Sequence, residues 1–461
     1  MSRWSFLAIP AVVMALAFGA QQPAHRIDAR RAPSTRPQVP ELLYTAALVY
    51  DLSAALHGAE RFPRGAQIMI LRDGHATPLV SSLAASADPS LSFDGKTVLF
   101  AGKQNADDPW QIWSMALDGS EPRRVLIAST DLIRPLWMPD RRIVYARRTP
   151  EGFALETAGL DGASVQRLSF LPGNFIPDDV LRDGRVLFES GFPLGAGSVP
   201  ELYLVYADGS GVESVRCDHE AADRQHGRQL QSSDIVFTRG GSLARFTSAL
   251  AEEAPVAGPA GDFAGDVAEL PDSRWVVSLR LHGTRHYALH IVKPGAPATM
   301  LLVRDADRDL VEPVLIAPRP APNRHPSALH EWTTGNLLAL NAQLSRGGNL
   351  KTAPASVGAE TLDSKGGVVD LGTAPIETDG SFFVQAAGDR PLRFILLDAQ
   401  GHTLRKEQGW FWVRRGEQRI CVGCHTGPER APDNRVPQVL LRTTTPVALT
   451  GSSGSPATGG R

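Results

Sequence analysis

The stretch DPSLSFDGKTVLFAG, residues 88–102, has the layout of a β-hairpin: an extended segment, a polar turn at Asp94-Gly95 and an apolar strand. An Asp-Gly pair supplies the positive φ that tight hairpin turns require. Val98 and Phe100 recur at every second position, as on one face of a strand. The stretch therefore predicts two paired strands joined by a tight turn.

The same layout recurs along the chain. Further copies begin at Arg134, Pro177, Gly227, Gly265 and Glu312. A period near 40–50 residues is typical of one four-stranded propeller blade. Further Asp-Gly pairs stand at 118–119, 161–162, 183–184 and 208–209. Six copies predict a six-bladed β-propeller over residues 42–320, and the phrases resemble the repeats of TolB-like propellers.

Composition agrees with a chain that is mostly β. The 43 Gly and 35 Pro of the 461 residues interrupt the chain too often for long helices. With 43% apolar residues, 21% charged residues and a formal net charge of -2, the chain has the composition of an ordinary globular protein. This charge indicates no nucleic-acid partner.

A second, smaller β domain is predicted after the propeller. Prolines concentrate around residues 321–334 and favour an extended linker there. The stretches GNLLALNAQL from Gly335, APIETDGSFFVQA from Ala374 and PLRFILLDAQGHTL from Pro391 are typical of strands, so residues 335–449 are predicted to form a small β-sandwich-like domain. The low-complexity residues 450–461 are predicted to be disordered.

The stretch ICVGCHTGPERAP, residues 420–432, holds two of the three cysteines of the chain. Cys421, Cys424 and His425 have the C-x-x-C-H spacing of a c-type haem attachment site, in which two thiols form thioethers to the porphyrin and the histidine ligates the iron. A structural disulfide or half of a zinc site is the alternative. A two-cysteine disulfide would leave His425 unexplained, and the N-terminus is typical of an exported chain, so we expect one covalent haem c.

The N-terminus is typical of an exported protein. Arg3 precedes an apolar run from Phe6 to Phe18, and small residues follow near Ala20, as in a cleaved signal peptide over residues 1–20. The run is shorter than the roughly 20 residues that span a membrane. We therefore expect a periplasmic or otherwise exported protein with no membrane span after cleavage.

The succession of a six-bladed propeller, the tract from about Thr378 to Pro437 and the C-x-x-C-H motif resembles the alpha subunit of hydrazine synthase. The resemblance implies that Cys421 and Cys424 carry the haem, that His425 belongs to the haem motif, and that the protein performs redox chemistry on small nitrogen compounds in a multi-subunit complex. The chain departs from that family in two ways. It lacks a second haem motif, and Glu429 stands where the family's middle domain has an iron-ligating tyrosine.

The haem surroundings must come partly from elsewhere in the chain, because only residues 426–461 follow the motif. Trp410, Phe411 and Trp412 are candidate apolar walls, and a strand core is the alternative interpretation. Since no methionine lies in the sandwich domain, we expect no methionine on the iron. A histidine, such as His325, His330 or His402, or an open position remains.

The third cysteine lies in another polar stretch, RCDHEAADRQH. Cys217, His219 and His226 are weak candidates for a zinc site, because thiolate and imidazole suit zinc. The alternative is a free buried thiol with two surface histidines.

The function predicted from sequence is that of a periplasmic monohaem c redox protein. A haem-dependent oxidoreductase acting on a small molecule, an electron-transfer module that docks to a partner protein, and a propeller scaffold with a structural haem all remain open. The catalytic residues stay unknown, because no other catalytic motif is present.

Overall fold

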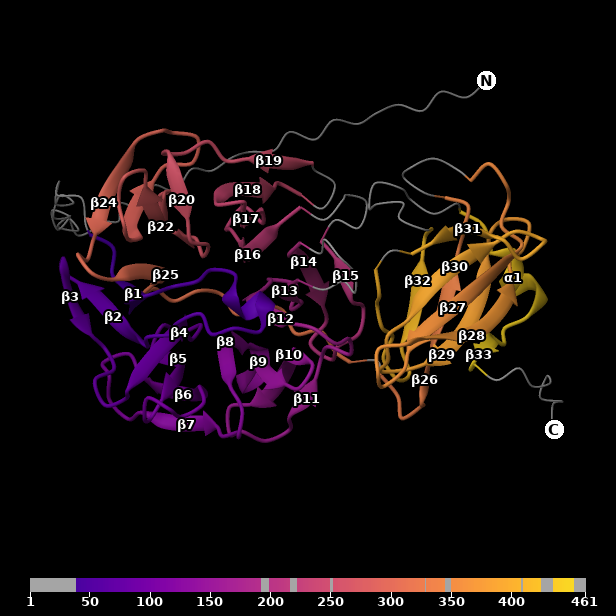
Figure 1. The fold of residues 1–461 in the computed structure, drawn as a ribbon, viewed down its shortest axis with the longest axis horizontal. Coiled ribbons are helices and arrows are strands. Elements are labelled where there is room, and N and C mark those ends of the chain that lie inside the picture. The colour runs from indigo at the N-terminus through magenta and orange to yellow at the C-terminus, as the bar shows by residue number, and fades with distance from the viewer. Residues whose placement is uncertain are drawn as a thin grey trace, which may run out of the picture. The chain divides into compact units, whose positions relative to one another are not determined.

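The structure is a computed structural model that describes residues 39–191, 199–215, 222–248, 252–327, 329–344, 350–407, 409–423 and 434–451. These residues are mostly strand and form eight sheets, six in a propeller and two in a sandwich, which confirms the predicted fold class (Figure 1). The predicted signal peptide lies outside the described residues. Within them, no helix is long and apolar enough to cross a membrane.

Each propeller blade is an antiparallel sheet that runs outward from the axis. Blade one contains β25 (Asp309–Leu315), β1 (Leu42–Ala47), β2 (Ala66–Arg72) and β3 (His75–Pro78). Blade two contains β4 (Ala85–Leu91), β5 (Thr97–Lys103), β6 (Gln111–Ala116) and β7 (Arg123–Leu126). Blade three contains β8 (Leu132–Met138), β9 (Arg142–Thr149), β10 (Gly152–Gly159) and β11 (Gln166–Arg167), with the short 3-10 helix η2 (Pro139–Arg141) between its first two strands.

The other three blades follow the same plan. Blade four contains β12 (Phe175–Val180), β13 (Val186–Ser190), β14 (Glu201–Val205) and β15 (Glu213–Ser214). Blade five contains β16 (Arg224–Gln229), β17 (Ile235–Arg239), β18 (Ser242–Phe246) and β19 (Glu253–Pro255). Blade six contains β20 (Gly261–Phe263), β21 (Ala268–Glu269), β22 (Trp275–Leu281), β23 (Ala288–Val292) and β24 (Thr299–Val303), and both β20 and β21 pair with β22.

The ring closes by pairing strands from the two ends of the propeller sequence. β25 pairs antiparallel with β1, with Leu42 opposite Leu315 and Ala47 opposite Asp309. The predicted Asp-Gly turns are confirmed, because the glycines of these pairs have φ between 73° and 88°. Gly209, for example, has φ 84°.

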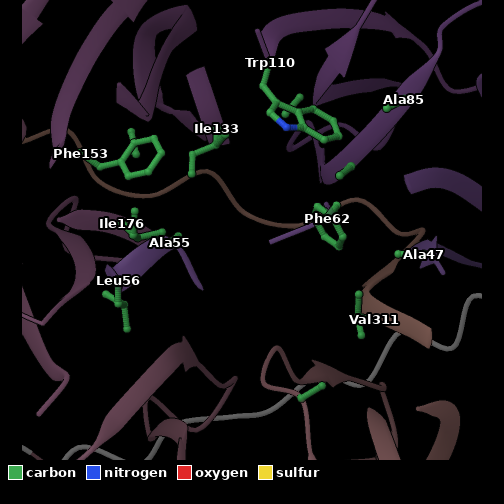
Figure 2. Close-up of a cluster of buried hydrophobic side chains, with 14 of the residues drawn as sticks. Ala47, Ala55, Leu56, Phe62, Ala85, Trp110, Ile133, Phe153, Ile176 and Val311 are labelled. Atoms are coloured by element: carbon green, nitrogen blue, oxygen red, sulfur yellow. The ribbon is translucent and has the colours of Figure 1, made fainter. Parts of the chain in front are cut away.

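Apolar side chains fill part of the propeller axis. The 3-10 helix η1 (Ala54–His57) leaves blade one between β1 and β2 and buries Leu56. Figure 2 shows Leu56 and Phe62 in one cluster with Ile133 of β8, Ile176 of β12 and other inner-strand residues. The segment between β1 and β2 thus packs inside the propeller against the inner strands of several blades.

The sandwich consists of two four-stranded sheets. The first contains β32 (Gln418–Cys421), β26 (Thr334–Ala339), β29 (Phe382–Ala387) and β33 (Val447–Leu449). The second contains β28 (Val368–Pro375), β27 (Ser356–Leu362), β30 (Arg393–Leu397) and β31 (Thr403–Lys406), and the helix α1 (Gln438–Arg442) lies between β32 and β33 in sequence. Leu337 and Val384 from the first sheet meet Val357 and Leu396 from the second in one buried core.

The sandwich contacts blades three and four through the segment between β31 and β32. Trp412 is 1% exposed, and its indole Nε1 donates to the carbonyl of Gly209 at 2.8 Å. Its ring meets Phe170 and Phe175 edge to face, at centroid distances of 6.1 and 6.3 Å. The guanidinium of Arg419 donates to the carbonyl of Val212 at 2.5 Å. The interface therefore combines a buried aromatic anchor with hydrogen bonds to the backbone of the propeller.

The segment between β25 and β26 follows the hairpin turns of the propeller. The amide of Arg319 donates to the carbonyl of Phe93 at 2.8 Å, and the amide of Asn323 donates to the carbonyl of Arg182 at 2.8 Å. His325 then stacks on Tyr206, with ring centroids 3.9 Å apart. These contacts attach the Pro-rich segment to the blades.

Candidate functional site

Cys421 is the last residue of β32, an edge strand of the sandwich. β32 runs parallel to β26 and places Cys421 beside Ala339, and the carbonyl of Cys421 accepts from the amide of Leu340 at 2.8 Å. The thiol is free and partly buried. Burial raises its pKa, and the nearby charge of Arg419 opposes that shift. The backbone of the first motif residue is therefore held by the sheet.

The remaining motif residues, Cys424 and His425, lie outside the described residues, as does Glu429. The haem assignment of Cys421, Cys424 and His425 therefore stays a prediction.

A small depression lies just beyond Cys421. It is lined by Leu340, Asn341, Leu344, Asp379, Val422, Arg435 and Pro437, and its cavity holds about 20 Å³. Close to one water fits such a space, so it cannot hold a porphyrin. Leu344, Val422 and Arg435 stand beside residues 345–349 and 424–433, which are not described.

The chain that returns from the motif is attached to this end of the sandwich. A carboxylate oxygen of Asp379 accepts from the amide of Gln438 at 2.9 Å, and the hydroxyl of Ser381 accepts from the amide of Val439 at 3.1 Å. Burial alone would raise the pKa of Asp379, but hydrogen bonds from the Ser381 hydroxyl and from the Gln438 amide lower it. The start of α1 is thereby attached to the loop before β29.

An apolar row lies on the outer face of the sheet, next to Cys421 in sequence. Ile420 is 65% exposed and pairs with Leu338, which in turn pairs with Phe383. Residues opposite one another in neighbouring strands point to the same face, so these three form an apolar row on the outer face of the sheet. Cys421 lies opposite Ala339 of the sandwich core and therefore points to the other face of the sheet, so the apolar row adjoins Cys421 along the backbone only.

The expectation that Trp410 and Trp412 form haem walls is corrected by their packing. Both belong to a core cluster with propeller residues such as Phe175 and Phe188. Phe411 packs on Phe394 of the sandwich core, at a centroid distance of 5.5 Å. The three aromatics serve the interface and the core because they precede β32, where the chain passes along blades three and four.

The other predicted iron ligands have neighbours of their own. His325 stacks on Tyr206, and His330 lies 5.4 Å from Trp332, ring to ring. His402 Nδ1 lies 3.1 Å from a carboxylate oxygen of Asp398. These contacts leave the sixth iron ligand unassigned.

The structure separates the weak zinc candidates into described and undescribed residues. Cys217 and His219 lie outside the described residues, so the zinc prediction stays untested. His226 lies in β16 and is 2% exposed, beside Asp178 and Glu189. Sequence reasoning missed these two carboxylates. The available signal was a polar or charged residue at or next to the start of every repeat, as in Asp88, Arg134 and Glu312.

Comparisons with known proteins agree with this architecture. Residues 333–426 match the model of the hydrazine synthase alpha subunit middle domain, and the match includes Cys421, Cys424 and His425. No curated protein matches the chain.

Among solved structures, hydrazine synthase from Kuenenia stuttgartiensis aligns with a TM-score of 0.75 and 17% identity, over 88% of this chain and 71% of that one. TolB from Acinetobacter baumannii aligns with a TM-score of 0.41 and 13% identity, over 60% of this chain and 66% of that one. The chain therefore resembles the hydrazine synthase alpha subunit in the sequence of residues 333–426 and hydrazine synthase in the fold of most of its length.

Proposed function

We propose that this protein is an exported monohaem c redox protein that acts on a small molecule, such as a small nitrogen compound. The observation that carries the proposal is the position of C-V-G-C-H within the matched residues 333–426, directly at the end of β32. The similarity to the hydrazine synthase alpha subunit supports a related function. Membership of a multi-subunit complex and a periplasmic location form part of the same proposal.

In this proposal Cys421 and Cys424 bind the porphyrin through thioethers and His425 ligates the iron. A haem c supplies a one-electron iron couple and, where an axial position is open, a binding position for a small molecule. Ile420, Leu338 and Phe383 form an apolar row on the opposite face of the same strands. The sheet hydrogen bond between Leu340 and Cys421 holds the backbone there, so the cofactor keeps a fixed position relative to the sandwich.

One observation favours electron transfer to a partner protein as the second candidate. Ile420 adjoins Cys421 and is 65% exposed. A haem attached at such an edge presents part of its rim to a docking partner. An electron carrier keeps both axial positions occupied, whereas an enzyme keeps one open.

The test is ligand binding by the full chain, produced with a haem c maturation system. We expect covalent haem, recognised by pyridine haemochrome spectra, and a ferrous or ferric spectrum that shifts on addition of nitric oxide or cyanide. A low-spin spectrum that neither ligand changes would contradict the enzyme function and favour electron transfer to a partner protein. A protein without covalent haem would contradict both. The near-infrared band of methionine-ligated ferric haem should be missing.

A further inference from the structure

The six inner strands of the propeller share a break in their regular pairing. Register shifts or gaps occur near the start of every sequence repeat, for example between Ala87 and Ser90 and between Gln225 and Arg228. Residues at these breaks have left-handed backbone, with φ 58° at Asp88, 54° at Arg134, 53° at His226 and 58° at Glu312. Each break adds a residue to the inner strand and directs a polar side chain into a buried cluster.

This cluster holds more negative than positive groups. In the part of the chain that the structure describes, its buried carboxylates are those of Asp88, Asp178, Glu189, Asp266 and Glu312. Its guanidinium groups are those of Arg61 and Arg134, with Arg228 at its margin. With every group ionised, five carboxylates would face three guanidinium groups, and Arg228 is shared with Asp179, so at least two negative charges would remain uncompensated. Buried charges without compensation are costly, so the cluster must take up protons or a cation.

The excess lies where blades four and five meet. Arg61 pairs with Asp88 and Glu312, and Arg134 lies 2.9 Å from a carboxylate oxygen of Asp266. Among the described residues, Asp178 has one salt bridge, the longer contact of 3.3 Å to Arg134, and its other oxygen accepts from the amide of Gly227 at 3.0 Å. Glu189 has no salt bridge among the described residues, and one of its oxygens accepts from the amide of His226 at 2.7 Å. Burial and then the Glu189 charge raise the pKa of Asp178 well above its usual range.

His226 lies beside these two carboxylates with an unsatisfied imidazole. It is 2% exposed, and neither ring nitrogen has a hydrogen-bond partner. Gly265 makes room for the ring, because a Cβ there would lie 2.5 Å from His226 Cγ. A buried ring nitrogen that bonds to nothing loses its hydration without replacement. The imidazole therefore needs a partner that the described side chains do not supply.

We propose that Asp178, Glu189 and His226 bind one divalent transition-metal ion at the centre of the propeller. One donor atom from each residue lies within 4.8 Å of the other two. Two ligands on one ion at bonds of about 2.1 Å can be at most about 4.2 Å apart, so a small side-chain movement completes the site. The imidazole favours a transition metal over Ca²⁺ or Mg²⁺, which take oxygen ligands.

The ion would satisfy the imidazole and neutralise the two excess charges. It would also connect β12 and β13 of blade four to β16 of blade five. Blade four carries Gly209 and Val212, which accept hydrogen bonds from the sandwich. The metal would therefore stabilise the part of the propeller on which the sandwich docks.

The experiment is Mn²⁺ binding by the full chain after treatment with EDTA, followed by the loss of the free-ion EPR signal. Mn²⁺ is chosen because it prefers carboxylate and imidazole over thiolate, so the cysteines elsewhere in the chain do not compete. We expect one Mn²⁺ per chain and a higher Tm in its presence. Glu189→Gln and His226→Gln should each weaken binding at least about tenfold.

The control variant is His290→Gln, which alters another buried propeller histidine, one that already bonds to Thr299 at 3.0 Å. Its Mn²⁺ affinity should equal that of the wild type. Glu189→Gln keeps an oxygen to accept from the His226 amide, and by removing one like charge beside Asp178 it should raise the Tm of the metal-free protein. Equal affinity in the wild type and both ligand variants, or no saturable binding by the wild type, would overturn the proposal.

Discussion

The propeller and the sandwich place their reactive side chains in opposite ways. The propeller buries charges along its axis, where Arg61 and Arg134 are 5% and 3% exposed and lie among carboxylates. The sandwich carries its one described cysteine at the end of an edge strand, beside an exposed Ile420. A ring of repeats can orient six inner strands toward one point, whereas a sandwich fills its interior with apolar side chains. Its chemistry must therefore attach to an edge.

The largest effect expected from this difference concerns the edge site. Replacing both Cys421 and Cys424 by Ala should abolish covalent haem, because both thioether bonds are lost, while the propeller remains folded. Haem retained after acid-acetone extraction measures the outcome. Cys217→Ala is the matched control and should keep all of its haem. Haem that stays on the double variant would refute the attachment site.

The next effect concerns the interface between the two regions. Trp412→Ala removes a side chain that is 1% exposed, together with its hydrogen bond to Gly209. Truncation of a buried tryptophan typically costs about 3–5 kcal/mol. We expect chemical denaturation to show the sandwich unfolding at lower denaturant concentration, apart from the propeller.

Trp332→Ala provides the comparison for that experiment. Trp332 is 54% exposed, so its loss should change the free energy of unfolding by about 0.5 kcal/mol or less. Equal destabilisation by the two substitutions would mean that Trp412 does not anchor the sandwich.

The repeats made most of the propeller predictable. Asp94-Gly95 and its counterparts mark the hairpins, and the regular distance between copies reveals the number of blades. The sandwich has no such repetition. The sequence does not mark its strands β27 and β28, because Gly358 and Gly372 interrupt the alternation of apolar and polar residues that identifies a strand.

Long-range contacts limit what the sequence can reveal about individual residues. Trp412 looks like a strand-core residue, and its partner Gly209 lies 203 positions away. In the same way, the polar residues at the repeat starts resemble turn residues in the sequence. Only the folded propeller, in which the six inner strands meet at the axis, shows that they are buried together. Their common burial at one axis follows from closure of the ring, which depends on the pairing of β25 with β1.

A smaller effect tests the buried charges of the propeller by pH. Burial, together with the Asp88 charge, raises the pKa of Glu312 to about 7, and Arg61 opposes the shift. The protonated carboxyl is favoured in the folded state. Its contribution to stability is therefore present below the ordinary pKa of 4.5 and is lost as the pH rises through about 7.

Between pH 4.5 and about 7, the free energy of unfolding of the wild type should consequently fall relative to that of the Glu312→Gln variant. The fall should be at most about 1.4 kcal/mol per pH unit. Denaturant titrations at several pH values measure this slope. Glu151→Gln, at an exposed position, should keep the wild-type slope. Parallel curves for the wild type and Glu312→Gln would show that this carboxyl does not take up a proton on folding.

The smallest effect concerns the segment that joins the two regions. His325 stacks on Tyr206 at 3.9 Å, and the backbone next to it is attached to the hairpin turns of the blades. A stacked ring pair contributes about 0.5–1.5 kcal/mol beyond its buried area, and other contacts of the segment survive in His325→Ala. We therefore expect a loss of about 1 kcal/mol and faster hydrogen exchange at Asn323, whose amide bonds to the carbonyl of Arg182. His402→Ala removes an exposed histidine instead and should leave that exchange unchanged. Exchange at Asn323 that is already unprotected in the wild type would show that the segment is a free linker, and that Trp412 and its neighbours alone hold the sandwich to the propeller.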